Sequence, residues 1–328
     1  MAAAAQVGVT TMCAATLPLI DVATLDSQAT LAVLDDACRE WGFFYAVRHG
    51  IAERIFDDVQ TDARAFFAQS RESKRAITRT ADNPWGYFDR EYTKNTRDWK
   101  ETFDYGPADG GALVPQWPRG LPSFRRSVLA CYGACEDLSF RLLHALARNL
   151  GRPHEGLDAA FDPAHTSFIR LNHYPPCPEP ARPSGVATPA RGYLGVNHHT
   201  DSGVLTLLLQ DEHAGLEVLH DGVWRPVMPR RDALVVNIGD IVQVWSNDRY
   251  RAALHRVVVN PDHDRLSVAF FLNPTYEATY APLPTTVDAL HPPRYRPIRW
   301  GEFRARRTAG DYADIGAEVQ ITDYRLTE

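Results

Sequence analysis

Two histidines and an aspartate, His199, Asp201 and His255, are the residues of this chain whose types and spacing best suit chemistry. Two imidazoles and one carboxylate form a ligand set for a divalent transition metal such as Fe(II), and they leave its remaining coordination positions open. Side chains two residues apart leave an extended strand from the same face, so His199 and Asp201 would face the metal while His198 points away. His255 lies in the apolar run 253–259, which indicates a separate strand. The spacing therefore predicts a metal site built by two strands.

This pattern is weak alone, because His-x-Asp pairs arise by chance and a lone strand histidine is usually only packed and hydrogen-bonded. Further polar residues strengthen it: Arg265 and Ser267 share one face of a predicted strand, while Arg170, Asn172 and Tyr174 share one face of another. A guanidinium offers a fork of donors that matches a carboxylate. Burying Arg265 without an anion is unfavourable, so an anionic ligand is expected. The alternative is a structural ion pair with an acidic side chain, which is the commoner role for a single arginine.

The composition is that of an ordinary globular protein. The chain has 328 residues, of which 45% are hydrophobic and 23% charged. Its net charge of -6 argues against a nucleic-acid partner, and no apolar run is long enough to span a membrane. The first six residues lack the basic residues of a signal peptide, so export is not expected. An odd number of scattered cysteines favours reduced thiols and a cytoplasmic location; they are Cys13, Cys38, Cys131, Cys135 and Cys177.

The apolar pattern predicts a helical first half and a β-rich second half. Ser27 is expected to cap a helix through about Arg39, and further helices are expected over 52–70 and 122–150, the last ended by Gly151. The core-facing positions predicted for the last helix are Leu129, Tyr132, Leu138, Leu142 and Leu146. A strand is expected over 42–47 and an irregular segment over 107–122.

From Thr166 onward, short β-rich runs recur between turn residues. They lie at 168–174, 204–210, 216–220, 223–227, 233–237, 241–245, 254–259 and 266–273. Eight such runs predict a mainly β fold with flanking helices, built on a double-stranded β-helix or jelly-roll core. Residues 1–120 would form an N-terminal region integral to this fold, and 121–328 a long support helix with the catalytic jelly roll. The Pro-rich segment 175–192 fits a mobile lid and a passive surface loop equally well.

Several motifs, in this order along the chain, resemble those of the Fe(II)/2-oxoglutarate-dependent dioxygenases of the isopenicillin N synthase-like superfamily. The resemblance covers nearly the whole chain. The motifs are LPLID at 17–21, WGFF at 41–44, HGI at 49–51, DWKE at 98–101, NHYPP at 172–176, HTDSG at 199–203, LLLQD at 207–211, NIGD at 237–240, WSNDRY at 245–250, LHRV at 254–257 and RLS at 265–267. One departure is His173, where relatives often carry tyrosine; it is expected to face away from the site.

The resemblance implies roles for these positions. His199, Asp201 and His255 would hold Fe(II). Arg265 and Ser267 would bind the distal carboxylate of 2-oxoglutarate, with help from two residues of the preceding strand, Tyr174 and Asn172. Dioxygen would be the remaining co-reactant. The implied activity is hydroxylation or desaturation of a small molecule, with oxidative decarboxylation of 2-oxoglutarate to succinate and CO2. The implied enzyme is a monomer, and a secondary metabolite or modified amino acid is its expected substrate.

Fewer sequence features support the expected substrate contacts than support the metal and cosubstrate residues. Arg170 would contact a polar or anionic part of the substrate, or it would form a salt bridge with a nearby acid. Phe271 would stack on a substrate ring, or it would be ordinary core. Thr102, Asp104 and Tyr105 would line the mouth of the site by analogy with the family.

Two other functions compete with this one. Isopenicillin N synthase and aminocyclopropane-carboxylate oxidase keep the same triad and Arg-x-Ser pair without using 2-oxoglutarate, so these residues alone do not separate the two chemistries. A non-catalytic jelly-roll binding module is the other alternative, which an intact triad disfavours.

Overall fold

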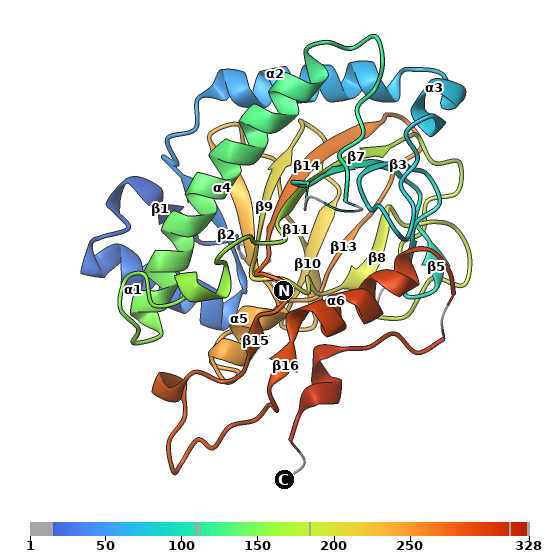
Figure 1. Cartoon of the computed structure of the whole chain (residues 1–328). Coiled ribbons are helices and arrows are strands. Elements are labelled where there is room, and N and C mark those ends of the chain that lie inside the picture. Colours follow the sequence, from blue (N-terminus) through green and yellow to red (C-terminus); the bar gives the residue numbers. More distant parts are fainter. Residues whose placement is uncertain (1–15, 109–110, 112, 184, 315, 327–328) are drawn as a thin grey trace, which may run out of the picture.

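The computed structural model describes residues 16–108, 111, 113–183, 185–314 and 316–326. The N-terminal residues on which the expectation about export rests lie outside these, as does Cys13. Within the described part, the chain is mostly β, and its three longest helices lie on one side of the larger sheet, as Figure 1 shows. The helices are α1 (Gln28–Glu40), α2 (Glu53–Phe67), α3 (Arg71–Arg75), α4 (Phe124–Asn149), α5 (Asp240–Trp245) and α6 (Trp300–Thr308).

Two sheets carry most of the strands. The eight-stranded sheet has the order β1 (Leu19–Asp21), β2 (Phe43–Val47), β12 (Ala233–Ile238), β9 (Leu205–Gln210), β14 (Arg265–Leu272), β7 (Phe168–Tyr174), β6 (Glu101–Tyr105) and β3 (Gly86–Phe88). The four-stranded sheet has the order β11 (Val223–Pro226), β10 (Leu216–His220), β13 (His255–Val257) and β8 (Val196–His199). Two small pairs are β15 (Thr279–Tyr280) with β16 (Ile298–Arg299) and β4 (Tyr92–Thr93) with β5 (Thr96–Arg97).

Strands β7 and β14 pair antiparallel and have one apolar and one polar face. Arg265 lies opposite Tyr174 and Ser267 opposite Asn172, so the polar residues of both strands share a face. The alternate residues belong to the main hydrophobic cluster, together with buried side chains of α4: Ile169, Leu171, Leu266, Val268 and Phe270. The period-two pattern therefore turns one face of the sheet to the helices and the other to the interior between the sheets.

The long helices form where the apolar spacing predicts them. Ser27 caps α1 by accepting a hydrogen bond from the Thr30 amide, and Gly151 follows α4 with a φ of +73° that suits glycine. Tyr132, Leu138, Leu142 and Leu146 are buried in α4 as expected. The expectation for Leu129 was wrong: its side chain is exposed, because it sits at the edge of the apolar stripe.

The predicted strand at 241–245 was also wrong, because this segment forms helix α5. Gly239 is its N-cap, and Ile241, Val242, Val244 and Trp245 are all buried. A short apolar run that is buried all round carries no periodicity that would separate a strand from a helix. The β-branched residues favoured the strand, and packing overrode that preference.

The N-terminal region supplies four strands, β1, β2, β3 and β6, to the same sheet as β7 and β14. The sequence patterns gave no expectation for the strands between 86 and 105 or for α6. A domain boundary near residue 120 stays a prediction.

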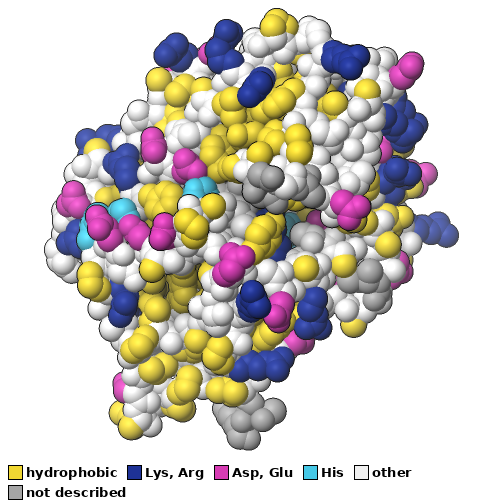
Figure 2. Space-filling view, viewed as in Figure 1, with side chains coloured by type: hydrophobic (Ala, Val, Ile, Leu, Met, Phe, Trp, Pro, Cys, Tyr) yellow, Lys and Arg dark blue, Asp and Glu magenta, His cyan; other side chains and the backbone are white. Residues whose placement is uncertain are grey.

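No helix in the described part of the chain has the length and apolar character needed to cross a bilayer. On the face drawn in Figure 2, acidic and basic side chains are interspersed, with hydrophobic ones among them. That face therefore presents no extended field of one sign.

Candidate active site

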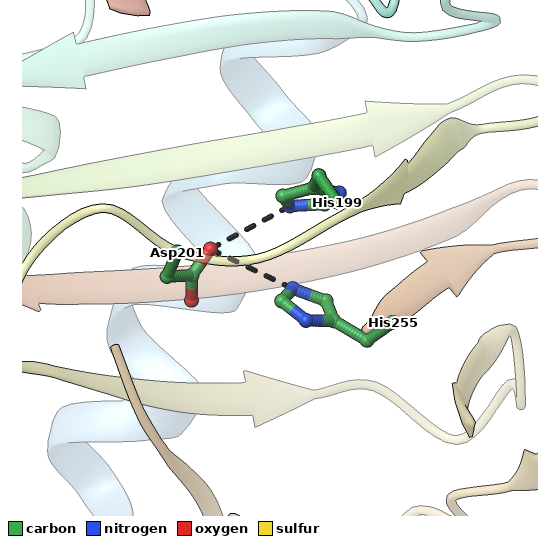
Figure 3. Close-up of side chains that lie close together, drawn as sticks. All are labelled: His199, Asp201 and His255. Carbon is green, nitrogen blue, oxygen red and sulfur yellow. Dashed lines mark ion pairs between the residues drawn. The ribbon is translucent and has the colours of Figure 1, made fainter. Parts of the chain in front are cut away.

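The three predicted metal ligands meet between neighbouring strands of the smaller sheet. His199 ends β8, His255 begins β13, and these two residues are partners in the antiparallel pair. Asp201 lies two residues beyond the end of β8 rather than on the strand. Its Oδ1 atom is 3.5 Å from Nε2 of His199 and 3.6 Å from Nε2 of His255 (Figure 3). One ligand atom from each residue lies within 4.8 Å of the others, so the three side chains could hold one metal ion.

Hydrogen bonds aim the ligand atoms of this cluster. Nδ1 of His199 donates to the Asn197 carbonyl at 2.8 Å, and Nδ1 of His255 donates to the Ala253 carbonyl at 3.1 Å. Because a carbonyl can only accept, both Nε2 atoms are left with a free lone pair for a metal. These contacts fix the tautomer and the orientation of both rings.

The carboxylate of Asp201 is held in the same way. Its Oδ2 accepts hydrogen bonds from the Thr206 hydroxyl and, at 2.8 Å, from the Asn237 amide, which leaves Oδ1 directed at the two imidazoles. His198 is not part of this cluster: its ring Nδ1 lies 3.1 Å from the side-chain oxygen of Asn197. The choice of His199 over His198 is therefore supported by geometry.

The electrostatics of the cluster suit a positive charge held between its members. Burial, followed by the charge of His255, lowers the pKa of His199 to about 4. Burial acts to raise the pKa of Asp201, but the positive charge that His255 carries when it is protonated holds this pKa well below its usual value. Burial acts to lower the pKa of His255, and the Asp201 carboxylate reverses this, so it is raised. The buried carboxylate thus attracts a cation, whether a proton on an imidazole or a metal ion.

Arg265 lies on the large sheet with only 2% of its surface exposed. Its Nη2 donates to the Gln210 side-chain oxygen at 2.9 Å and its Nε to the His213 carbonyl at 3.2 Å, while its buried Nη1 has no partner among the described residues. The guanidinium lies 5.1 Å from the ring centroid of Tyr174. Ser267 is also buried and accepts a 3.4 Å hydrogen bond from Asn172. In the described part of the chain no acid pairs with Arg265, so this buried cation keeps its Nη1 group free to donate to an anionic ligand.

Glycines make room around this arginine. A Cβ atom at Gly215 would come within 2.8 Å of the Arg265 side chain, and one at Gly195 would come within 2.7 Å of the Tyr174 ring. Both contacts are shorter than side chains tolerate. The backbone therefore approaches these two residues more closely than any other amino acid would permit.

A cavity of about 350 Å³ lies next to the metal cluster. Its lining includes His199 and Asp201 and, among the predicted substrate contacts, Arg170, Phe271 and Asp104. Arg265, Ser267, Asn172 and Tyr174 lie further along the same strand face, outside this lining. The polar strand face thus begins at the cosubstrate residues and ends at the cavity.

The other two expected substrate contacts do not reach this cavity. Tyr105 lies on the opposite face of β6 from Asp104, with its ring between those of Trp117 and Tyr132. Thr102 is completely buried, and its hydroxyl donates to the Phe88 carbonyl at 3.4 Å. The alternation of β6 explains Tyr105: residues next to one another on a strand point to opposite faces.

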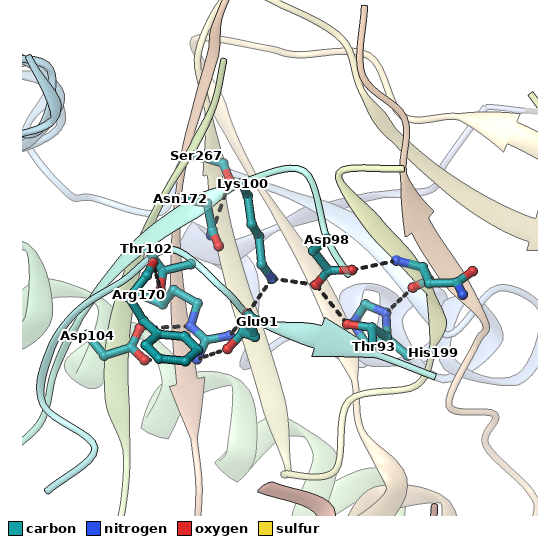
Figure 4. A network of polar contacts seen from close by, with 12 residues as sticks. Glu91, Thr93, Asp98, Lys100, Thr102, Asp104, Arg170, Asn172, His199 and Ser267 are labelled. Atoms are coloured by element: carbon teal, nitrogen blue, oxygen red, sulfur yellow. Dashed lines mark hydrogen bonds and ion pairs between the residues drawn. The ribbon is translucent and has the colours of Figure 1, made fainter. Parts of the chain in front are cut away.

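Arg170 forms the salt bridge that was the alternative to substrate binding. Its guanidinium donates to Asp104 at 2.7 and 2.8 Å and to Glu91 at 3.1 Å (Figure 4). Both acids also pair with Arg79, and Glu91 pairs with Lys100 at 2.6 Å. Arg170 therefore belongs to a buried network of charges that satisfy one another. As expected, His173 faces the other way, toward Glu101 and Asp264.

Several site residues were missed by the sequence patterns. Thr206 and Asn237 hold Asp201, Gln210 holds Arg265, and Lys100 extends its ammonium toward Glu91 and Asp98 (Figure 4). Gln210 lies opposite Ser267 in the sheet, so strand alternation from the Arg-x-Ser pair would have found it. The other contacts join distant segments and leave no local signal.

The chain is similar to known proteins over most of its length. Residues 165–274 match the family described as the 2OG-Fe(II) oxygenase superfamily, and residues 17–120 match the N-terminal region of the non-haem dioxygenases in morphine synthesis. Flavanone 3-dioxygenase 2 of Oryza sativa subsp. japonica is 34% identical over 295 residues, which cover 88% of this chain and 82% of that protein. Gibberellin 20 oxidase 1-B of Triticum aestivum is 35% identical over 299 residues, with coverage of 87% and 79%.

Solved structures agree with these relatives. The structure of JOX2 in complex with 2OG, Fe and JA has a TM-score of 0.83 at 30% identity and covers 96% of this chain and 90% of that one. The structure of the dioxygenase for auxin oxidation in rice has a TM-score of 0.72 at 28% identity, with coverage of 94% and 100%. Together with the buried His-Asp-His cluster, they show that this chain belongs to the 2OG-Fe(II) oxygenase superfamily.

Proposed function

We propose that this enzyme uses Fe(II), 2-oxoglutarate and dioxygen to hydroxylate or desaturate a small organic molecule, with His199, Asp201 and His255 as the iron ligands. The observation that carries the assignment is the convergence of three oriented ligand atoms on one point, beside a cavity large enough for a small molecule. The donor set fits the metal, because two neutral imidazoles and one carboxylate leave open positions for exogenous ligands.

Arg265 is proposed to bind the distal carboxylate of 2-oxoglutarate. Its free Nη1 supports this role, as do the Ser267 hydroxyl on the same face and the neutral nature of its protein partners. Tyr174 and Asn172 would complete the carboxylate site from β7. A forked guanidinium suits this task better than an ammonium, because it can bond both carboxylate oxygens at once.

Bound iron supplies the centre at which dioxygen is reduced while 2-oxoglutarate loses CO2 to become succinate. One oxygen atom ends in succinate, and the other enters the product as a hydroxyl or leaves as water when the substrate loses two hydrogens. The protein orients 2-oxoglutarate through Arg265 and Ser267. Asn237 and Thr206 hold the Asp201 carboxylate in one orientation throughout, since both are buried and bonded to Oδ2.

The two main sheets are proposed to be the two halves of a jelly roll, with the iron ligands on the smaller sheet and the cosubstrate residues on the larger. The relatives are named for flavanones, gibberellins and auxin, or are crystallised with JA, which supports a secondary-metabolite or hormone-like substrate. The monomeric state, the cytoplasmic location, the absence of a nucleic-acid partner and the role of 175–192 as a lid stay predictions.

The test combines metal binding with turnover. Anaerobic titration with Fe(II) should show one tight site that His255→Ala removes. A screen of small molecules should then yield succinate in proportion to product, with product masses that show a gain of one oxygen or a loss of two hydrogens. Turnover of an accepted substrate without succinate would favour the 2-oxoglutarate-independent chemistry, and an absence of iron binding would favour a non-catalytic module.

A further inference from the structure

The charges that line the cavity differ in whether another charge neutralises them. Arg79 and Arg170 share Asp104 and Glu91, and Lys100 lies 2.6 Å from Glu91. The charges of these groups neutralise one another, so the network has little capacity for a further charged ligand. Groups that lack such partners are the candidates for contact with a substrate.

Arg304 on α6 is a cavity-lining cation without an acidic partner among the described residues. It is 9% exposed, and within that part of the chain its guanidinium makes a single hydrogen bond, from Nη1 to the Thr166 carbonyl at 2.8 Å. The guanidinium lies among three aromatic rings, 5.2 Å from the centroid of Phe168, 5.7 Å from Tyr276 and 5.8 Å from Trp300. Aromatic faces stabilise a cation without supplying hydrogen-bond acceptors, so the remaining donors of Arg304 stay available.

The surroundings do not supply the missing anion. Asp311 also lines the cavity, but no ion pair joins it to Arg304, and burial, followed by the charge of Glu91, raises its pKa to about 7. Asp104 is already shared by two arginines. Arg307, on the same helix, is a useful contrast, because its guanidinium donates three hydrogen bonds to neutral oxygens of the protein, against one for Arg304 in the described part of the chain.

Arg304 lies at the opposite end of the strand pair from Arg265. Arg265 faces Tyr174 at the end of β7, and Arg304 packs over Phe168 at its start, six residues or about 20 Å of extended chain away. Between them, Phe168 stacks on Phe271 with ring centroids 4.6 Å apart, and both rings line the cavity. Phe271 is opposite Thr206, which bonds to the iron ligand Asp201, so this aromatic wall runs from the metal cluster toward Arg304.

We propose that the substrate is a small organic acid whose carboxylate binds Arg304 and whose apolar body lies against Phe168 and Phe271. This inference rests on the proposed function and adds the substrate class and its orientation. In this orientation the acid group lies at the end of the cavity far from the cosubstrate arginine Arg265. A carbon remote from the carboxylate then faces the metal. Two buried arginines that lack an acidic partner in the described part of the chain, at the two ends of one strand pair, thus receive two different carboxylates.

Equilibrium dialysis with matched acids and amides tests this. The probes are phenylacetate, 3-phenylpropionate and cyclohexylacetate, each compared with its primary amide, on protein loaded anaerobically with Fe(II) and saturating 2-oxoglutarate so that Arg265 is occupied. At least one acid should bind about tenfold or more tightly than its amide, because the amide has the same shape but lacks the charge. The proposal is overturned when no acid binds more tightly than its amide, which includes the case in which no probe binds.

Variants test whether Arg304 is responsible for the preference for an acid over its amide. Arg304→Gln should abolish it, and Arg304→Met, which keeps the unbranched stem between the rings, serves the same purpose if Arg304→Gln does not fold. Arg306→Gln is the control, since it removes the same charge from an exposed position of the same helix. An acid preference that survives in the Arg304 variants overturns the proposal. The same dialysis is repeated on metal-free wild-type and Arg304-variant protein, where an acid preference lost only in the variants belongs to Arg304 whatever the outcome of the Fe(II) titration. The two proposals can therefore fail separately.

Discussion

Two parts of the site are both buried and polar: the metal cluster, and the charged wall of the cavity, which consists of Arg79, Arg170, Asp104 and Glu91. They differ in whether their charges are neutralised within the protein. In the cluster, Nδ1 of each histidine and Oδ2 of Asp201 form hydrogen bonds with the protein. Nε2 of each histidine and Oδ1 of Asp201 are left directed at a common point. In the wall, Asp104 and Glu91 neutralise the charges of Arg79 and Arg170, although Nε of Arg79 has no hydrogen-bond partner among the described residues. A buried charge that no counter-charge neutralises marks a place for a ligand, while buried charges that neutralise one another mark structure.

The largest expected effect tests the cluster. Asp201→Ala should reduce succinate-coupled turnover to the level of a metal-free control, because the only anionic iron ligand is lost. The fold should be kept, although stability should fall by about 1–3 kcal/mol because the buried Thr206 hydroxyl and Asn237 amide lose their acceptor. His198→Ala, one residue from a ligand but outside the cluster, should retain turnover. Full activity of Asp201→Ala would contradict the ligand assignment.

The next effect tests the wall. Asp104→Ala should lower the free energy of unfolding by about 3–5 kcal/mol, because Arg79 and Arg170 would be left with one acid between them in a buried place. Chemical denaturation measures this. The exposed pair of Asp232 and Arg230 provides the control, and Asp232→Ala should change stability by less than about 1 kcal/mol. Equal effects from both substitutions would show that burial does not distinguish the wall.

A third prediction concerns Asp98, which lies between the wall and the cluster. It accepts hydrogen bonds from the Asn197 amide and from Thr93, and burial raises its pKa from 3.8 to about 6 although Lys100 opposes this. The folded state therefore binds this proton more tightly than the unfolded state, and its contribution to stability is lost as the pH rises from 3.8 to about 6.

Asp98→Asn removes this titration. Relative to wild type, the variant should gain about 3 kcal/mol of unfolding free energy between pH 3.8 and about pH 6 and change no further above it. Denaturation at a series of pH values measures the difference. A constant difference between the two proteins over this range would show that the acid is not buried as described.

The smallest expected effect on the enzyme concerns the forked guanidinium group of Arg265. Arg265→Lys keeps the charge but loses the bonds to Gln210 and to the His213 carbonyl that hold the side chain in place. The KM for 2-oxoglutarate should rise about tenfold to a hundredfold, since charged hydrogen bonds of roughly 1.5–3 kcal/mol are lost. The affinity for Fe(II) should stay unchanged. An unaltered KM would argue that Arg265 is a structural residue like Arg170.

Much of the site follows from local patterns. The two-residue spacing of Arg265 and Ser267, and of Arg170, Asn172 and Tyr174, predicts two polar strand faces, and the structure pairs them in register. The helices at 27–39, 52–70 and 122–150 form close to the predicted limits because their apolar stripes cover the large sheet. The prediction failed at 241–245, where a wholly buried run has no polar face from which to read a period.

The sequence by itself determined which residues can bind a metal and a carboxylate, because side-chain chemistry and strand alternation are local properties. Only the tertiary structure decided that Arg170 is neutralised while Arg304 is not, because an ion pair depends on which distant segments meet. Asp104, 66 residues from Arg170, reaches it across two adjacent strands, and α6 brings Arg304 to the same cavity from near the end of the chain without pairing it to any acid in the described residues.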